Sequence, residues 1–164
     1  MSDRYIDFVN SPLGQLLAKN LGLPAPLALD RFKADAPVVK GAVLVGAAAG
    51  GELTAAITQV LANIKAEVFA AADSAVHGLA SAAGLATVSY APAAEDGQKF
   101  KALIFDASGI TRSDDLIALH SFFSPVIRKL ANSSRIIVIG RTPELCDCPK
   151  HATAQRALEG FTRA

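Results

Sequence analysis

From residue 41 onward, short apolar segments alternate with longer segments in which apolar residues recur every three or four positions. The short segments are often β-branched and almost free of polar residues, which is typical of parallel strands covered on both faces. The longer segments have the period of helices that bury one side. Strands are expected at residues 42–45, 67–71, 87–90, 102–105 and 136–139. Helices are expected at residues 53–64, 74–83, 114–130 and 152–162.

This alternation predicts an α/β fold with a doubly wound, mostly parallel sheet. The third helix contains Pro125, so we expect a kink there. Between residues 90 and 102 the chain has only a short segment rich in alanine and charge, where a crossover helix would ordinarily lie. In the strand order 3-2-1-4-5 this link crosses roughly 14 Å, which a dozen extended residues span easily. We therefore expect a crossover without a helix, which removes one wall of an adenine pocket.

Residues 1–37 are predicted to form a separate N-terminal arm, with residues 38–164 as the main domain. Pro12 marks a helix start after Ser11, leucines follow at helical spacing, and Gly22 is a suitable stop. Residues 24–27 are expected to be extended because they contain two prolines. The arm is expected to lay one apolar face on the domain or on a partner chain. The chain ends inside a helical pattern, so the domain is expected to be incomplete at its C-terminal end.

A glycine-rich loop lies between the first expected strand and the first helix of the main domain. Gly46, Gly50 and Gly51 occupy the place where a dinucleotide-binding unit has its glycine turn. Glu52 stands where the third glycine of that motif is expected, at the helix end that a pyrophosphate needs. The alanines at 47–49 offer a phosphate neither hydroxyl nor charge. The loop therefore predicts a vestigial nucleotide site whose helix end is already occupied by the Glu52 carboxylate.

Composition and charge bear on the partners and the location of the protein. The formal net charge is +1, and the basic residues are scattered, so neither a nucleic acid nor an anionic membrane is expected as a partner. No apolar run approaches the roughly 20 residues that span a bilayer. The first residues are polar and acidic, unlike a secretory signal. Cys146 and Cys148 are too close for an unstrained disulfide, which favours free thiols and a cytoplasmic protein.

Four segments, in order, resemble motifs of the short-chain dehydrogenase/reductase family. Residues 45–52 (VGAAAGGE) resemble its Thr-Gly-x-x-x-Gly-x-Gly loop, and residues 106–112 (DASGITR) its Asn-Asn-Ala-Gly stretch. Residues 135–141 (RIIVIGR) are similar to the fifth strand, which ends on the catalytic serine. Residues 150–163 (KHATAQRALEGFTR) resemble the active-site helix, especially that of 3-oxoacyl-acyl-carrier-protein reductases. This resemblance implies a Rossmann-like or flavodoxin-like fold.

Residues 5–14 (YIDFVNSPLG) narrow the resemblance to high-molecular-weight bacterial 3-oxoacyl-acyl-carrier-protein reductases. Those proteins carry a degenerate, flavodoxin-like domain in front of a complete, NADPH-dependent reductase domain. The resemblance implies that this chain is that front domain, with the C-terminal reductase domain as its partner and no cofactor of its own. It also implies a homodimer built on the helices at residues 116–130 and 152–162, and roles in scaffolding, dimerisation or substrate gating within fatty-acid metabolism.

The family's catalytic serine, tyrosine and lysine positions correspond here to Arg141, His151 and Gln155. The family's chemistry needs a tyrosine hydroxyl that donates a proton, a lysine that lowers its pKa, and a serine hydroxyl on the same oxygen. None of the three residues in this chain supplies its counterpart's group, so no catalytic residue is expected. The competing interpretation is a helix start with polar, exposed groups.

Two alternative functions stay open on the sequence. One is a nucleotide-binding domain or an active NAD(P)-dependent oxidoreductase with an atypical site, and the other is a flavin-binding domain for FMN. Asp73, about 20 residues after the loop, could hold a ribose, although an N-cap for the next helix is the favoured interpretation. Asp106 and Ser108 are expected to keep the shape of the family's Asn-Asn-Ala-Gly turn while changing its donors.

A zinc site is a further hypothesis, carried by Cys146, Cys148 and His151. Structural zinc sites generally have four protein ligands and wider cysteine spacing. No fourth ligand is evident in the neighbouring sequence, so a reduced surface loop without metal is favoured. His77 and His120 fall in helical patterns and are interpreted as structural.

Overall fold

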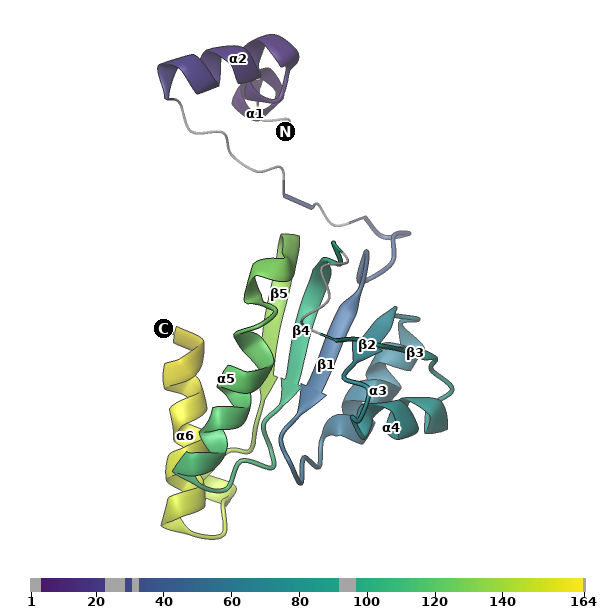
Figure 1. Cartoon of the computed structure of the whole chain (residues 1–164), viewed down its shortest axis with the longest axis vertical. Helices are drawn as coiled ribbons and strands as arrows, with labels where there is room; N and C mark the ends of the chain where they lie inside the picture. The colour runs from purple at the N-terminus through teal and green to yellow at the C-terminus, as the bar shows by residue number, and fades with distance from the viewer. Residues whose placement is uncertain (1–3, 23–28, 31–32, 92–96, 164) are drawn as a thin grey trace. The chain divides into compact units, whose positions relative to one another are not determined.

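A computed structural model of the chain describes residues 4–22, 29–30, 33–91 and 97–163 (Figure 1). The chain forms two compact units, Met1–Lys33 and Ala34–Ala164. The expectation that residues 24–27 are extended lies outside the described residues.

The small unit contains two helices, α1 (Arg4–Val9) and α2 (Pro12–Leu21). The predicted limits of α2 are confirmed: the Ser11 hydroxyl accepts a hydrogen bond from the backbone N–H of Gly14 (3.1 Å), and Gly22 ends the helix in the left-handed conformation. Helix α1 was not predicted, because it spans only six residues.

The main unit contains a five-stranded sheet in which every pair of neighbours is parallel, in the order β3-β2-β1-β4-β5. This order confirms the predicted doubly wound α/β fold, of the Rossmann or flavodoxin-like type. The register of β1 and β4 ends with Ala47 opposite Asp106. The strands are β1 (Val43–Ala47), β2 (Val68–Ala70), β3 (Thr87–Ser89), β4 (Phe100–Asp106) and β5 (Leu130–Ile139).

Helices cover both faces of the sheet (Figure 1). Helices α3 (Thr54–Asn63) and α4 (Val76–Ala82) pack over one apolar cluster, and α5 (Ile117–Phe123) and α6 (Pro149–Arg163) pack over the other. Successive residues of a strand point to opposite faces, so alternate side chains of β1 and β4 enter different clusters. Three short 3₁₀ turns complete the unit: η1 (Ser113–Leu116), η2 (Ile127–Lys129) and η3 (Pro143–Leu145).

The predicted helix over residues 114–130 is wrong. Helix α5 ends at Phe123, and β5 already begins at Leu130. Pro125 explains the early end, because proline has no N–H to donate and its ring clashes with the carbonyl of the preceding turn. The last α-helical bond runs from Ser124 N to His120 O, and the chain then continues through tighter turns. The proline terminates the helix rather than kinking it.

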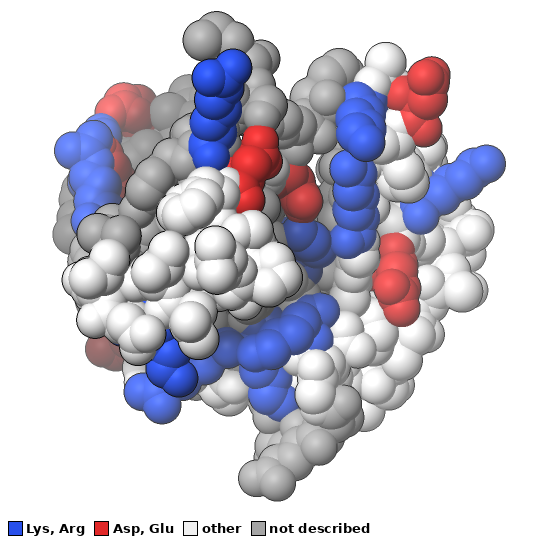
Figure 2. Space-filling model, turned by 90° about the horizontal axis from the view of Figure 1, so that it is seen from above, with Lys and Arg blue, Asp and Glu red and all other residues white. Residues whose placement is uncertain are grey.

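The crossover from β3 to β4 has no helix in its described part, which is Ala91 and residues 97–99. Residues 92–96 lie outside the described residues, so the expectation of a helix-free link remains a prediction there. Charges on the surface are mixed: basic and acidic side chains both occur in Figure 2. This agrees with the formal net charge of +1.

Gly109 allows the loop after β4 to touch the glycine loop. A Cβ at Gly109 would lie 2.7 Å from Gly51 N and 2.8 Å from Gly50 C, both backbone atoms that have no room to move. By contrast, a Cβ on Gly78 in α4 would meet no atom within 4 Å.

We therefore predict opposite effects of two glycine-to-alanine substitutions. Gly109→Ala should lower the free energy of unfolding by about 1–3 kcal/mol, because the methyl group overpacks two backbone segments. Gly78→Ala, the matched control, should raise it by about 0.5–1 kcal/mol through helix propensity. Urea unfolding followed by circular dichroism measures both, and a neutral Gly109→Ala would contradict the tight loop contact.

Candidate functional site

The candidate site lies at the C-terminal ends of the central strands, where ligands bind in open α/β sheets. Ala47 at the end of β1 is in register with Asp106 at the end of β4. The glycine loop after β1 and the loop after β4 therefore leave the sheet side by side. The backbone N–H of Ala48 donates to Asp106 O (2.8 Å), which continues the pairing into the loops.

Asp106 is a fully buried carboxylate that accepts four hydrogen bonds. Its Oδ2 accepts from Leu53 N (2.9 Å) and Thr54 Oγ1 (2.7 Å). Its Oδ1 accepts from Ser108 N (3.0 Å) and Ser108 Oγ (2.6 Å). A buried charge is tolerated only where such donors replace its lost hydration.

These bonds place a negative charge at the N-terminus of α3. Leu53 N–H bonds to Asp106, and the N–H of Glu52 donates to Ser108 Oγ (2.8 Å). Two of the amide groups that a phosphate could use in front of this helix are therefore already paired. The carboxylate that accepts hydrogen bonds at this helix end is that of Asp106, which is distant in sequence. That Glu52 opposes a phosphate here stays a prediction.

The glycines of the loop are needed for this packing, because a side chain at each position would clash or strain the backbone. Gly51 passes so close to the cap that a Cβ would lie 2.8 Å from Asp106 Oδ2. Gly50 has a φ of +74°, a backbone conformation that disfavours side chains. Gly46 lies under the ring of Phe122, which a Cβ would approach to 2.5 Å.

Glu52 forms an ion pair with Arg141 instead of capping the helix. The Glu52 side chain is 64% exposed and that of Arg141 is 33% exposed, so the pair lies at the surface. The hydrogen bond to the Glu52 carboxylate, and then its charge, raise the pKa of Arg141. Glu52 and Arg141 thus neutralise one another, at two positions where the motifs they resemble have other residues. Their ion pair ties the glycine loop to the end of β5.

Gln155 is buried, with 3% of its surface exposed. Its Nε2 donates to Ala107 O (2.9 Å) and Ile110 O (2.7 Å), and its Oε1 accepts from Arg141 N (2.7 Å). This one amide joins α6 to the loops after β4 and β5. The prediction of exposed polar groups at this helix is wrong for Gln155.

His151 is also buried, at 5% exposure, which again differs from the predicted exposed helix start. Residues 151, 154, 155 and 158 form the buried stripe of α6. That spacing is helical, so a count of the period would have found both polar residues on the inner face. His151 Nδ1 lies 3.9 Å from Asp147 Oδ2, and its Nε2 has no hydrogen-bond partner among the described residues.

Cys146 and Cys148 are free thiols, as predicted. The Cys146 thiol donates to Thr142 O (3.6 Å). Among the described residues, no group of three or more His, Cys, Asp and Glu side chains is arranged to hold a metal ion. The part of the chain described here therefore offers nothing that favours the zinc hypothesis.

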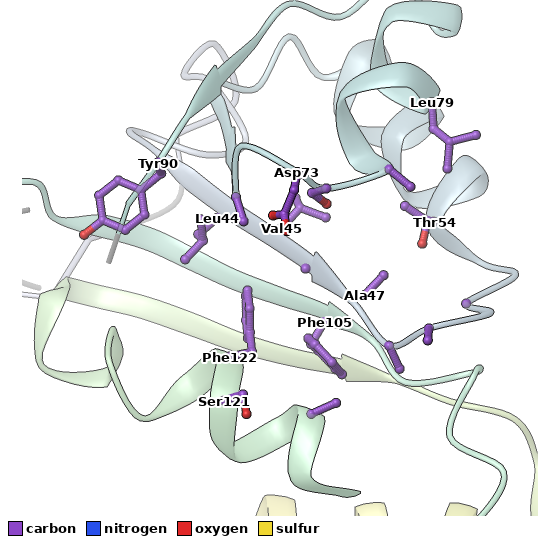
Figure 3. A pocket seen from close by; sticks show the side chains of 18 of the residues that line it. Leu44, Val45, Ala47, Thr54, Asp73, Leu79, Tyr90, Phe105, Ser121 and Phe122 are labelled. Atoms are coloured by element: carbon purple, nitrogen blue, oxygen red, sulfur yellow. The ribbon is translucent and has the colours of Figure 1, made fainter. Parts of the chain in front are cut away.

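A cavity of about 560 Å³ lies against the glycine loop (Figure 3). Its walls come from the end of β1, the segment after β2, and helix α5. Phe105 and Phe122 line it with rings whose centroids are 5.0 Å apart, and Tyr90 lines it as well. The sequence predicted a closed nucleotide site. The structure closes the phosphate position but leaves a cavity beside it.

Asp73 lines this cavity and does not cap a helix. The favoured prediction of an N-cap is wrong, because the neighbouring Ser74 performs that role: its Oγ accepts from Val76 N (3.2 Å). Asp73 makes no hydrogen bond or ion pair with the residues that the structure describes. Its carboxylate is exposed at the cavity.

His77 has a structural role that the sequence did not reveal in detail. Its Nε2 lies 2.9 Å from Ala71 O and its Nδ1 2.7 Å from Thr87 Oγ1. Because a carbonyl only accepts, Nε2 donates to Ala71 O, and Nδ1 pairs with the Thr87 hydroxyl. His77 thereby holds the end of β2 beside β3.

No protein-family model matches the chain, and no curated protein matches it. Within the described residues, no helix is both long enough and apolar enough to cross a membrane.

Asp106→Asn should lower the free energy of unfolding by about 3 kcal/mol. Asparagine has one acceptor oxygen, so its NH₂ would face two of the four donors and leave them unpaired in a buried site. Asp114→Asn is the matched control, because Asp114 is 84% exposed and only pairs with Arg112 at the surface. That control should change stability by less than about 0.5 kcal/mol. Equal effects of both variants in urea unfolding would contradict the capping role.

Gln155→Met should lower the free energy of unfolding by about 2–3 kcal/mol, since it leaves Arg141 N–H and two carbonyls without their partner. Gln59→Met is the control: Gln59 is exposed on α3 and bonds only to Asn63 (3.2 Å). It should stay within about 0.5 kcal/mol of the parent chain. Denaturant titration measures the free energy of unfolding of both variants. If Gln155→Met were as stable as the parent chain, this amide would not join α6 to the sheet.

Proposed function

We propose that this chain is a non-catalytic domain of an NADPH-dependent 3-oxoacyl reductase of the short-chain dehydrogenase/reductase family. In this proposal it stands in front of a C-terminal reductase domain in the cytoplasm. It serves as a scaffold, in dimerisation or in gating the acyl substrate. The fold and the four motif-like segments support the kinship. The main support for a loss of cofactor binding is the Asp106 carboxylate, which caps the N-terminus of α3.

The Asp106 cap opposes dinucleotide binding for two reasons. A pyrophosphate at the α3 N-terminus would have to displace a carboxylate that accepts four hydrogen bonds. It would also meet that carboxylate's charge. Two like charges about 4 Å apart repel by about 1 kcal/mol in water and several-fold more where solvent is partly excluded.

The residues at the family's catalytic positions support the same proposal. Reduction of a ketone by this family needs a hydroxyl proton donor beside a cation. Gln155 is neutral, and its amide is fully used by backbone groups. Arg141 is held by Glu52, and His151 is buried. In the proposal, these side chains stabilise the domain and take no part in catalysis.

Exposed apolar side chains on the α5 and β5 side support a scaffold role. Ile117 on α5 is 65% exposed, Phe161 on α6 is 41% exposed, and Ile136 and Ile137 of β5 are 45% and 40% exposed. The strand β5 is also an edge of the sheet. Apolar groups along an edge are typical of contact surfaces. In the proposal this side contacts the reductase domain or a second copy.

One observation favours the alternative, a nucleotide-binding domain or an oxidoreductase with an atypical site. A cavity lies beside the glycine loop, and the Asp73 carboxylate lines it. A ribose hydroxyl could donate to such a carboxylate. A flavin is less well served, because residues 47–49 are alanines without side-chain donors.

Titration with NADPH, NADH and FMN tests the proposed function. A ligand at about 100 times its Kd adds about 2.7 kcal/mol to the stability of the folded chain, which raises Tm by several degrees. We expect no such rise with any of the three cofactors, and no oxidation of NADPH with a 3-oxoacyl thioester. Light scattering should show a dimer. A Tm increase of several degrees with NADPH at micromolar concentration would refute the proposal.

A further inference from the structure

We propose that the cavity beside the glycine loop binds an apolar organic cation, with its ammonium group on Asp73. This site is distinct from the capped phosphate position, and the inference does not depend on the kinship proposed above. Its basis is the shape of the cavity, the charges that line it, and the one carboxylate among the lining residues, Asp73, which has no hydrogen bond or ion pair with the described residues.

The size and walls of the cavity suit a small molecule with an apolar body. Its volume of about 560 Å³ falls within the range of small-molecule sites, roughly 300–1,000 Å³. Figure 3 shows Phe105 and Phe122 together on one side, from β4 and α5. Leu44, Val45 and Leu79 add aliphatic surface. A planar or aliphatic ligand would bury its surface against these groups.

The charges near Asp73 and the glycine loop disfavour an anion. The lining residues all belong to the described part of the chain, and they include Asp73 but no lysine, arginine or histidine. The buried Asp106 carboxylate bonds to Thr54, which also lines the cavity, and adds a second negative charge close by. The positive end of α3 is used by that same carboxylate. A phosphate or carboxylate placed near Asp73 and Thr54 would thus meet negative potential.

Asp73 is the group that fixes the charged end of the ligand. It lies on the segment after β2 and has no hydrogen bond or ion pair with the described residues. Of the four lining hydroxyls, three already have partners: that of Thr54 donates to Asp106, that of Ser74 accepts from Val76 N, and that of Tyr90 accepts from Lys129 Nζ (2.7 Å). The fourth, on Ser121, carries no charge. Lys129 also lies over the Tyr90 ring, so that end of the cavity repels a cation and directs the ammonium to Asp73.

Three naphthalene compounds with matched bodies test the inference: 2-(1-naphthyl)ethylamine, 2-(1-naphthyl)ethanol and 1-naphthylacetate. The chain has no tryptophan, so naphthyl fluorescence anisotropy reports binding directly. The amine should bind about five- to tenfold more tightly than the alcohol, and the carboxylate about tenfold more weakly than the alcohol. Amide chemical shifts in a ¹H–¹⁵N spectrum should change for the glycine loop and for Ser121.

Single substitutions test whether Asp73 produces the preference for the amine. Asp73→Asn should bring the amine to within about twofold of the alcohol, because the ion pair is gone. Glu67→Gln is the matched control: it removes the same charge just before β2, at the opposite end of that strand, and should leave the order unchanged. Ser121→Trp should weaken all three ligands, since this exposed residue of α5 lines the cavity. Binding to this variant is measured from the amide chemical shifts, because its tryptophan would add to the naphthyl fluorescence.

Three results would overturn the inference. They are carboxylate binding as tight as that of the amine, an amine preference that survives Asp73→Asn, and absence of binding by all three compounds. These results are separate from the cofactor titration, because NADPH binding would refute the proposed function without bearing on the amine. If Ser121→Trp fails to fold, the comparison of Asp73→Asn with Glu67→Gln still decides.

Discussion

The arrangement at the end of the sheet depends on one buried carboxylate. Asp106 extends from β4 and accepts hydrogen bonds from the start of α3 and from its own loop. It therefore holds the glycine loop against the loop after β4, and it requires glycine at 51, where no Cβ fits. A charge so deeply buried is stable only while all of its donors stay in place.

Two further contacts extend this arrangement toward β5 and α6. Gln155 joins the loop after β4 to the start of Arg141, and the Arg141 side chain reaches Glu52 on the glycine loop. A closed circuit of polar contacts thus runs through three loops at one edge of the sheet. The positions that would serve cofactor and substrate in a reductase are the positions that this circuit uses.

The fold was largely predictable because its signals are local. Runs such as residues 102–105 are apolar on both faces, and only strands of a doubly covered sheet need that pattern. Boundaries were less predictable. The helix expected to continue to residue 130 ends at Phe123, since Pro125 stops it and the chain turns into a strand. The first part of β5 is rich in polar residues and shows no apolar alternation, so its start could not be recognised.

The sequence by itself determined the order of strands and helices and the glycine turn. Each of these follows from residue type and short spacing. Only the tertiary structure decided that Asp106 caps α3, that Gln155 is buried, and that a cavity remains with Asp73 in its lining. The partners of Asp106 at Leu53 and Thr54 are 53 and 52 residues away along the chain, and those of Gln155 at Ala107 and Ile110 are 48 and 45 residues away. No local period encodes contacts at that distance, because they arise only when the parallel register brings two strand ends together.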